Sequence, residues 1–204
     1  MRGTAVRVRT WSAATTVAAA LLVLTGCTVD GPDPAPEPSS APAADDEVKL
    51  PPRPGDLPVA GKQDDDVCTW LTAEQQRSLQ IGGGQPVIKH GDNYNGCGFL
   101  GDTGAARFAI GVRIVPEPIE LFLDKINSSP GSRQVYALNG FSAVQSQIGG
   151  GESLGCDAFI DAAQGQTVWV NMQLQTPGAM NADQMCEKAQ TAAHSVVTTV
   201  QAQS

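Results

Sequence analysis

The side chains that most often perform catalysis are sparse in this chain, and none lies in a catalytic pattern. A serine hydrolase needs a nucleophile elbow of the form Gly-x-Ser-x-Gly, and the nearest stretch, residues 140–144, lacks the second glycine. Of the two histidines, His194 falls near the edge of the apolar stripe of the last expected helix, and His90 lies in a polar stretch. We favour a hydrated turn for His90 over a metal-binding or acid/base role. The sequence therefore predicts no catalytic residue, no metal and no cofactor.

The acidic residues and the glycine runs give no further sign of catalysis. The runs at residues 82–84 and 149–151 lack the Lys-Ser/Thr of a phosphate loop and do not fit Gly-x-Gly-x-x-Gly. A glycosidase needs two carboxyl groups in one cleft, and the acids available are Glu152, Asp157 and Asp161. The last two are expected on one face of one strand, directed towards solvent, so we expect a protein that is not an enzyme.

Four cysteines have a spacing that predicts disulfides. Cys68, Cys97, Cys156 and Cys186 are separated by 29, 59 and 30 residues, without the paired short gaps of a zinc site. An even number of cysteines in an exported domain indicates two disulfides, for which three pairings exist. We favour Cys68–Cys97 and Cys156–Cys186, because each closes a loop of similar length within one half of the domain. Free thiols in a metal or redox site are the less favoured alternative.

The fifth cysteine, Cys27, ends the tetrad Leu24-Thr25-Gly26-Cys27, after an uncharged run at residues 11–24 and three N-terminal arginines. A basic head, an apolar stretch and small residues describe a secretory signal peptide, and the run is shorter than the ~20 residues of a spanning helix. The tetrad resembles the lipobox of bacterial lipoproteins. That resemblance implies cleavage after residue 26, a diacylglyceryl group on Cys27 and a palmitate-bearing anchor on the outer face of the cell membrane. An ordinary signal peptide and an uncleaved anchor are the alternatives.

The expected mature chain is strongly acidic. Once the three arginines of the signal are removed, ten Lys and Arg face 21 Asp and Glu, which leaves a net charge of −11. Such a chain lacks the positive footprint of a nucleic-acid-binding protein and the polybasic patch that binds anionic lipid. We therefore expect no nucleic-acid partner, and contact with the membrane only through the lipid anchor.

Composition divides the expected mature chain into a linker and one domain. Residues 27–66 comprise the lipidated cysteine and a stretch that holds nine of the 14 prolines, interleaved with acids and nearly devoid of large apolar residues. Such a stretch cannot offset its ordering entropy, so a disordered linker is expected. Residues 67–204 are enough for one hydrophobic core and should form the disulfide-bonded domain.

Periodicity within residues 67–204 predicts an α+β domain. Residues 107–114 alternate between apolar and other side chains, as a half-buried strand does. A strong apolar stripe follows Asn181, an expected helix cap, and Thr72 with Gln75 fits a capping box. The expected order is α-β-β-α-β-β-β-α. It corresponds to an antiparallel sheet of about five strands with the helices packed on one face.

One strand of this sheet suggests a binding surface. In the expected strand at residues 166–175, an apolar row lies opposite Trp169, Asn171 and Gln173. If helices cover the apolar row, these three side chains stand on the open side of the sheet. A tryptophan among amides is a plausible recognition surface. The alternative is that Trp169 packs beneath a loop.

The layout resembles a broad actinobacterial family of lipoproteins that share a domain of unknown function. The resemblance rests on the lipobox, the Pro-rich acidic linker, Cys68-Thr69-Trp70-Leu71-Thr72 heading a helix, and Cys97-Gly98-Phe99. The family pattern is Asp-Pro-Cys-x-Leu-Leu-Thr followed by Cys-x-Trp, and this chain departs from it at Val67, Trp70 and Phe99. The resemblance implies a Cys68–Cys97 pair and a location in the cell envelope. It implies no activity. A second resemblance is to the extracellular sensor domains of bacterial kinases.

Together these observations favour a monomeric, membrane-anchored envelope protein whose domain binds a protein or cell-wall partner without catalysis. One alternative is an extracytoplasmic carrier or sensor of a small apolar or lipid ligand, which would need an apolar pocket of several hundred Å³. A weaker alternative is an envelope hydrolase, which would need acids or His90 in one cleft with perturbed pKa values.

Overall fold

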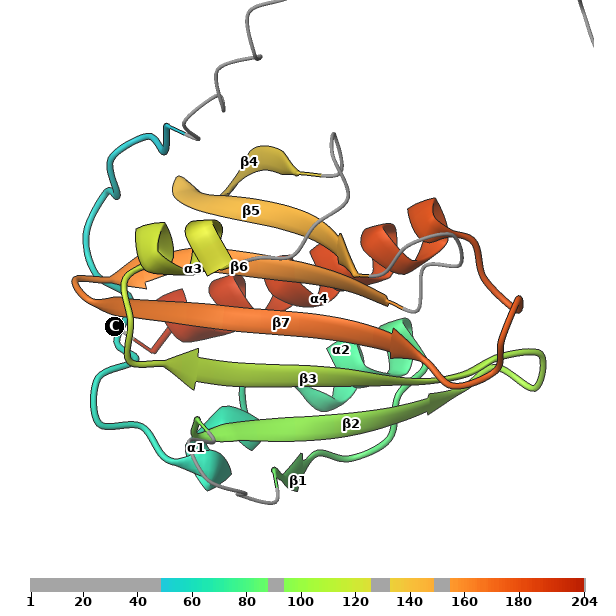
Figure 1. The fold of residues 1–204 in the computed structure, drawn as a ribbon. Helices are drawn as coiled ribbons and strands as arrows, with labels where there is room; N and C mark the ends of the chain where they lie inside the picture. Colours follow the sequence, from blue (N-terminus) through green and yellow to red (C-terminus); the bar gives the residue numbers. More distant parts are fainter. Residues whose placement is uncertain (1–48, 88–93, 126–132, 149–154, 204) are drawn as a thin grey trace, which may run out of the picture. The chain divides into compact units, whose positions relative to one another are not determined.

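The computed structural model describes residues 49–87, 94–125, 133–148 and 155–203, all within one domain. Its centre is a seven-stranded antiparallel sheet with strand order β1-β2-β3-β7-β6-β5-β4 (Figure 1). The strands are β1 (Gln85–Pro86), β2 (Gly96–Asp102), β3 (Arg107–Val115), β4 (Gln134–Leu138), β5 (Phe141–Ile148), β6 (Gly155–Ala163) and β7 (Gln166–Leu174). The helices are α1 (Asp64–Cys68), α2 (Ala73–Leu79), α3 (Ile119–Lys125) and α4 (Ala182–Gln201). The α+β class is confirmed.

The main hydrophobic core lies between the sheet and α4. We call the side of the sheet that α4 covers the core face and the opposite side the second face. Apolar side chains of the central strands lie on the core face, namely Phe108, Ile110, Val112, Ala158, Ile160, Val168, Val170 and Met172. The second face carries α3, which lies in front of the sheet in Figure 1, whereas α4 lies behind it. The helices therefore pack on both faces, and the expectation that one face stays uncovered is wrong.

The long helix α4 forms where the sequence predicted it. Asn181 caps its first turn by accepting a hydrogen bond from the Gln184 N–H at 2.9 Å, and the Gln184 side chain completes the capping box. The whole expected stripe is buried against the sheet: Met185, Ala189, Ala192, Ala193, Val196, Val197 and Val200. Several of these residues are alanines, so the helix backbone can lie close to the strands.

The shorter helix α2 follows the predicted capping box as well. Thr72 accepts from the Gln75 N–H, and Gln75 in turn accepts from the Thr72 N–H at 2.7 Å. The Gln75 amide also donates to the Thr199 hydroxyl of α4 at 3.1 Å. This contact ties α2 to the end of the long helix.

Two disulfides fasten helices to strands. Cys68–Cys97 joins α1 to β2, and Cys156–Cys186 joins β6 to α4. This is the pairing that the two similar loop lengths favoured. Trp70, two residues after Cys68, is fully buried in the core.

The sheet has seven strands, so the expected number of about five is wrong. Residues 133–148 form two strands, the hairpin of β4 and β5. Its turn is Asn139-Gly140, with φ values of 49° and 90°. Asn-Gly is the dipeptide that two-residue hairpin turns prefer, because both positions require positive φ. The two-residue β1 adds a further edge strand.

The folded domain also begins before residue 67. Leu57 and Val59 are buried in the core, and the Leu57 N–H donates to the Ala162 carbonyl at 2.8 Å. Helix α1 begins at Asp64, whose side chain accepts from the Gly96 N–H at 2.7 Å. Residues 27–66 have a low average hydrophobicity, so their composition did not indicate that Leu57 and Val59 pack in the core.

Candidate functional site

The second face of the sheet is unusual because its buried residues are largely polar. Seven polar or charged residues are buried in the described part of the chain. Gln145 contacts Gln190 of α4 on the core face. By strand alternation the other six lie on the second face: Ser142, Ser146, Asp157, Asp161, Thr167 and Asn171. Buried polar groups cost free energy unless they are hydrogen-bonded, so this arrangement needs a specific explanation.

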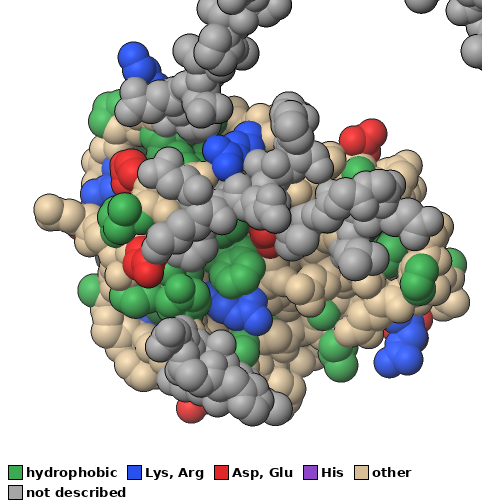
Figure 2. Space-filling model, viewed as in Figure 1, with side chains coloured by type: hydrophobic (Ala, Val, Ile, Leu, Met, Phe, Trp, Pro, Cys, Tyr) green, Lys and Arg blue, Asp and Glu red, His purple; other side chains and the backbone are tan. Residues whose placement is uncertain are grey.

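The centre of this face is a cluster from three adjacent strands. Arg113 of β3 pairs with Trp169 of β7, and Phe159 and Asp157 of β6 pair with Trp169 and Asn171. We call these five residues the second-face cluster. In Figure 2 hydrophobic side chains and Lys or Arg side chains adjoin one another on this side of the molecule.

Direct contacts hold the cluster together. The Arg113 guanidinium lies 5.0 Å from the Trp169 ring centroid and donates from Nη1 to Asn171 Oδ1 at 2.6 Å. The Trp169 indole Nε1 donates to Asp157 Oδ1 at 2.9 Å. Phe159 stacks on Trp169, with ring centroids 5.9 Å apart and planes inclined by 13°. The tryptophan ring thus links the cation, the carboxylate and an aromatic neighbour.

Gly111 makes room for the arginine. It is paired with Asn171 across β3 and β7. A Cβ at residue 111 would lie 2.3 Å from Asn171 Oδ1 and 2.7 Å from Arg113 Nη1. A glycine inside a strand often marks such a close approach. Here the absent side chain allows the guanidinium to lie across the strand and reach the amide.

Burial changes the acidity of both charged groups in the cluster. It raises the pKa of Asp157 to about 6, although the indole hydrogen bond and the charge of Arg113 lower it. Burial also lowers the pKa of Arg113, and the negative charge of Asp157 opposes that shift. Both shifts follow from the burial of Asp157 and the partial burial of Arg113 on the second face.

Apolar contacts and one ion pair surround the cluster. Ile119 and Leu123 of α3 pack with Val144 and Phe159, and Leu50 and Trp169 pack against this group. Further along β6, Arg53 forms a short ion pair with Asp161. Burial raises the pKa of Asp161, and the pairing with Arg53 opposes that rise.

The three residues of the expected binding surface differ in their exposure to solvent. Trp169 and Asn171 lie together on the second face, but Asn171 is buried, and Trp169 is half-buried. Gln173 is exposed near the end of β7, beyond the cluster. The expected solvent-facing position of Asp157 and Asp161 is wrong, since they are 6% and 7% exposed. Alternation placed them on the correct face, but α3 and the segment before α1 also pack there.

The remaining candidates lie elsewhere or outside the described residues. Cys27, His90 and Glu152 fall outside the residues that the structure describes. His194 is exposed on α4, and the Ser142 hydroxyl donates to the Pro51 carbonyl at 2.9 Å. Within the described ranges, no three His, Cys, Asp or Glu side chains are grouped closely enough to hold a metal ion. None of the helices described there is long and apolar enough to cross a membrane.

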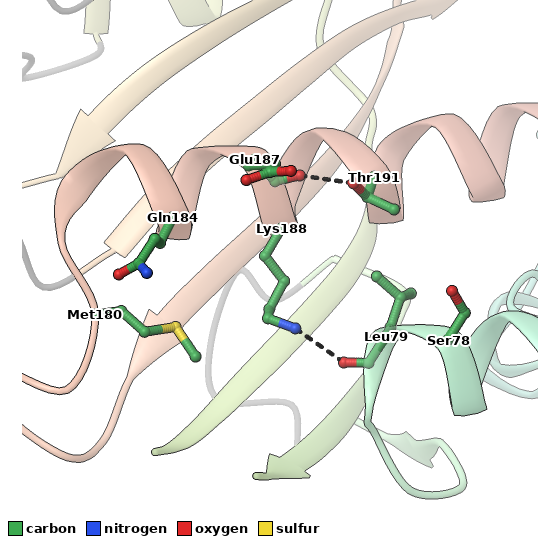
Figure 3. A pocket seen from close by; sticks show the side chains of 7 residues that line it. All are labelled: Ser78, Leu79, Met180, Gln184, Glu187, Lys188 and Thr191. Atoms are coloured by element: carbon green, nitrogen blue, oxygen red, sulfur yellow. Dashed lines mark hydrogen bonds between the residues drawn. The ribbon is translucent and has the colours of Figure 1, made fainter. Parts of the chain in front are cut away.

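Two grooves lie away from the second-face cluster. One, of about 310 Å³, lies between α2 and α4 (Figure 3) and is lined by Ser78, Leu79, Met180, Gln184, Glu187, Lys188 and Thr191. In it the Lys188 amine donates to the Leu79 carbonyl at 3.1 Å. The other, of about 520 Å³, is lined by residues that include Lys62, Asn95, Glu117 and Gln166. Both linings mix charged and amide groups with apolar ones, so neither is a mainly apolar pocket.

Arg113, like Phe159, is a residue of the cluster that the sequence did not single out. It stands in the clearest predicted strand, among the residues opposite the apolar row. The one available signal was Gly111, a glycine in the middle of that strand.

Comparison with known proteins gives a family and no activity. No curated protein matches the chain, and no solved structure matches it. One family model, described as a protein of unknown function (DUF3558), matches residues 22–199. This match covers most of the chain and agrees with the resemblance to a family whose domain has no assigned function. The chain therefore belongs to the DUF3558 family.

Proposed function

We propose that this protein is a lipid-anchored lipoprotein of the bacterial cell envelope, of the actinobacterial type, whose domain is a non-catalytic binding module. Residues 1–26 would be removed as a signal peptide, and acyl chains on Cys27 would hold the protein at the outer face of the membrane. Support for this part comes from the basic head, the apolar run and the tetrad ending at Cys27. Two or more acyl chains give stable attachment.

The second-face cluster is the observation that favours binding. The core face, which packs against α4, is lined mainly by apolar side chains. The second face instead buries a carboxylate and an amide beside an arginine and a half-buried tryptophan. Tryptophan and arginine are the residues most enriched where proteins bind partners. We therefore place the docking site for a protein or cell-wall partner on this face, around Trp169.

Geometry argues against hydrolysis by a carboxylate pair on this face. Asp157 and Asp161 are four residues apart on β6, which separates them by about 13 Å along the strand. Glycosidases use pairs about 5 to 9.5 Å apart. Asp161 is also occupied by its ion pair with Arg53. A hydrolase therefore remains the weaker alternative.

A carrier or sensor of a small apolar ligand is the second candidate. The groove between α2 and α4 favours it, because Leu79 and Met180 offer apolar surface there. Its volume of about 310 Å³ is at the lower end of the range for ligand sites. The charged side chains of Glu187 and Lys188 in the same lining make it a poorer site for a lipid.

Photo-crosslinking in cells tests the docking site. A photoreactive phenylalanine analogue would replace Gln173, which is exposed on the second face near the cluster, in the full-length chain. The matched control carries the analogue at His194, which is exposed on α4. We expect a discrete adduct from residue 173 and none from residue 194. Adducts from residue 194 alone, or equally from both, would place the partner elsewhere.

A further inference from the structure

The Arg113 guanidinium has more donors than the described part of the chain uses. It carries five N–H groups, and Nη1 donates to Asn171 Oδ1 at 2.6 Å. This acceptor is a neutral amide. Arg53, by contrast, forms ion pairs with Asp56 and Asp161. Asp157 attracts Arg113 only at longer range, so among the described residues the cation has no directly bonded anion.

The side chain is nevertheless held in a fixed position. Its guanidinium lies over the Trp169 ring, its Nη1 is bonded to Asn171, and the bare backbone of Gly111 leaves it the necessary space. A guanidinium fixed in this way loses little conformational freedom when a ligand binds. Its fork of N–H groups matches the paired oxygens of a carboxylate or phosphate.

On the basis of the proposed function, we propose that the second-face cluster recognises an oxyanion, a carboxylate or a phosphate group of the partner, with Arg113 as its anchor. The anion would supply a directly bonded counter-charge to this half-buried cation. Trp169 would support the guanidinium from its other side. The net charge of −11 on the mature chain repels anions at long range, so binding would depend on these local contacts.

The test uses the mature chain with Cys27→Ser, which is free of lipid, and follows indole N–H signals by nuclear magnetic resonance. The mature chain contains Trp70, fully buried in the core, and Trp169, so the first signal is an internal reference. The probes are sodium acetate and methyl phosphate, with acetamide as the uncharged control at matched ionic strength. We expect saturable shifts of the Trp169 signal with one or both anions, and neither saturation with acetamide nor movement of Trp70.

Variants of Arg113 test whether the anion binds at this side chain. Arg113→Gln should raise the Kd of the anion at least tenfold while leaving the Trp70 signal in place. Arg113→Lys, which keeps the charge but loses the fork, should bind with intermediate affinity. Equal titration of the wild type and Arg113→Gln would overturn the proposal, as would the absence of saturation with both anions. The relative affinities for acetate and methyl phosphate distinguish a carboxylate partner from a phosphorylated one.

The two proposals can fail separately. Crosslinking from residue 173 without anion binding would support the proposed docking site and refute the proposed recognition of an oxyanion. Anion binding without crosslinking would support Arg113 as a binding site for a small anion. It would refute the proposal that a macromolecular partner docks on this face.

Discussion

Replacement of both Cys156 and Cys186 by alanine should lower the free energy of unfolding by about 3–4 kcal/mol. This disulfide closes a loop with a sequence separation of 30 and fastens α4 to the central strand β6. Without it the unfolded chain gains conformational freedom, and the helix that covers the core is held only by packing and by side-chain hydrogen bonds such as that between Gln75 and Thr199. Since domains of this size are stable by only about 5–15 kcal/mol, the loss is a large share of the total. Urea unfolding of wild type and variant measures it.

The second disulfide is a natural comparison. Cys68–Cys97 has a separation of 29, so its chain-entropy contribution is nearly the same. It holds the five-residue helix α1 rather than α4. We therefore expect the Cys68→Ala/Cys97→Ala variant to lose a similar amount but to retain the α4 packing. A loss below about 1 kcal/mol in the Cys156→Ala/Cys186→Ala variant would contradict the role given to that disulfide.

Asp157→Asn should stabilise the domain at pH 7.5 and flatten its pH dependence. Burial raises the folded-state pKa of Asp157 from 3.8 to about 6, so the folded state favours the protonated acid. The contribution of this group to stability is therefore fully present below about pH 4, is lost as the pH rises to about 6, and stays lost above that. The shift corresponds to at most about 3 kcal/mol. Asparagine removes the buried charge and keeps an oxygen for the Trp169 indole.

The measurement is the free energy of unfolding at pH 4 and pH 7.5 for both proteins. Asp65→Asn is the matched control, because it removes the same charge from an exposed position on α1. The Trp169 indole signal of the wild type should also titrate with a midpoint near pH 6, and that of Asp157→Asn should not. If Asp157→Asn keeps the wild-type difference between pH 4 and pH 7.5, the buried charge assigned to Asp157 is contradicted.

Local sequence patterns were sufficient for most of the fold. The caps at Thr72 and Asn181 and the stripe of α4 depend on neighbours within one or two helical turns, so the sequence reveals them. The alternation of β3 is equally local. The strand count was wrong because the Asn139-Gly140 turn was not taken as a hairpin signal. The packing of Leu57 and Val59 in the core was not predicted, because they are two apolar residues in a polar stretch.

The sequence predicted only part of the site, because the remaining contacts join residues that are far apart in sequence. Alternation within β6 and β7 correctly placed Asp157 with Asp161 and Trp169 with Asn171 on common faces. The position of Arg113 over Trp169 depends on the register of β3 with β7, two strands more than 50 residues apart in sequence. The burial of Asp157 depends on what covers the second face, including α3 and Leu50. Neither the position of Arg113 nor the burial of Asp157 can be predicted from the periodicity of a single strand.

Native mass spectrometry of the chain purified from its own host tests the central claim most directly, that the protein is a lipid-anchored binding module and not a ligand carrier. The predicted result is a polypeptide that begins at Cys27, carries the mass of a lipid modification, and is four hydrogens lighter than the fully reduced chain. No small molecule should be released on denaturation. A chain without lipid at Cys27 would contradict the anchor, and a co-purified apolar ligand released on denaturation would make the protein a carrier.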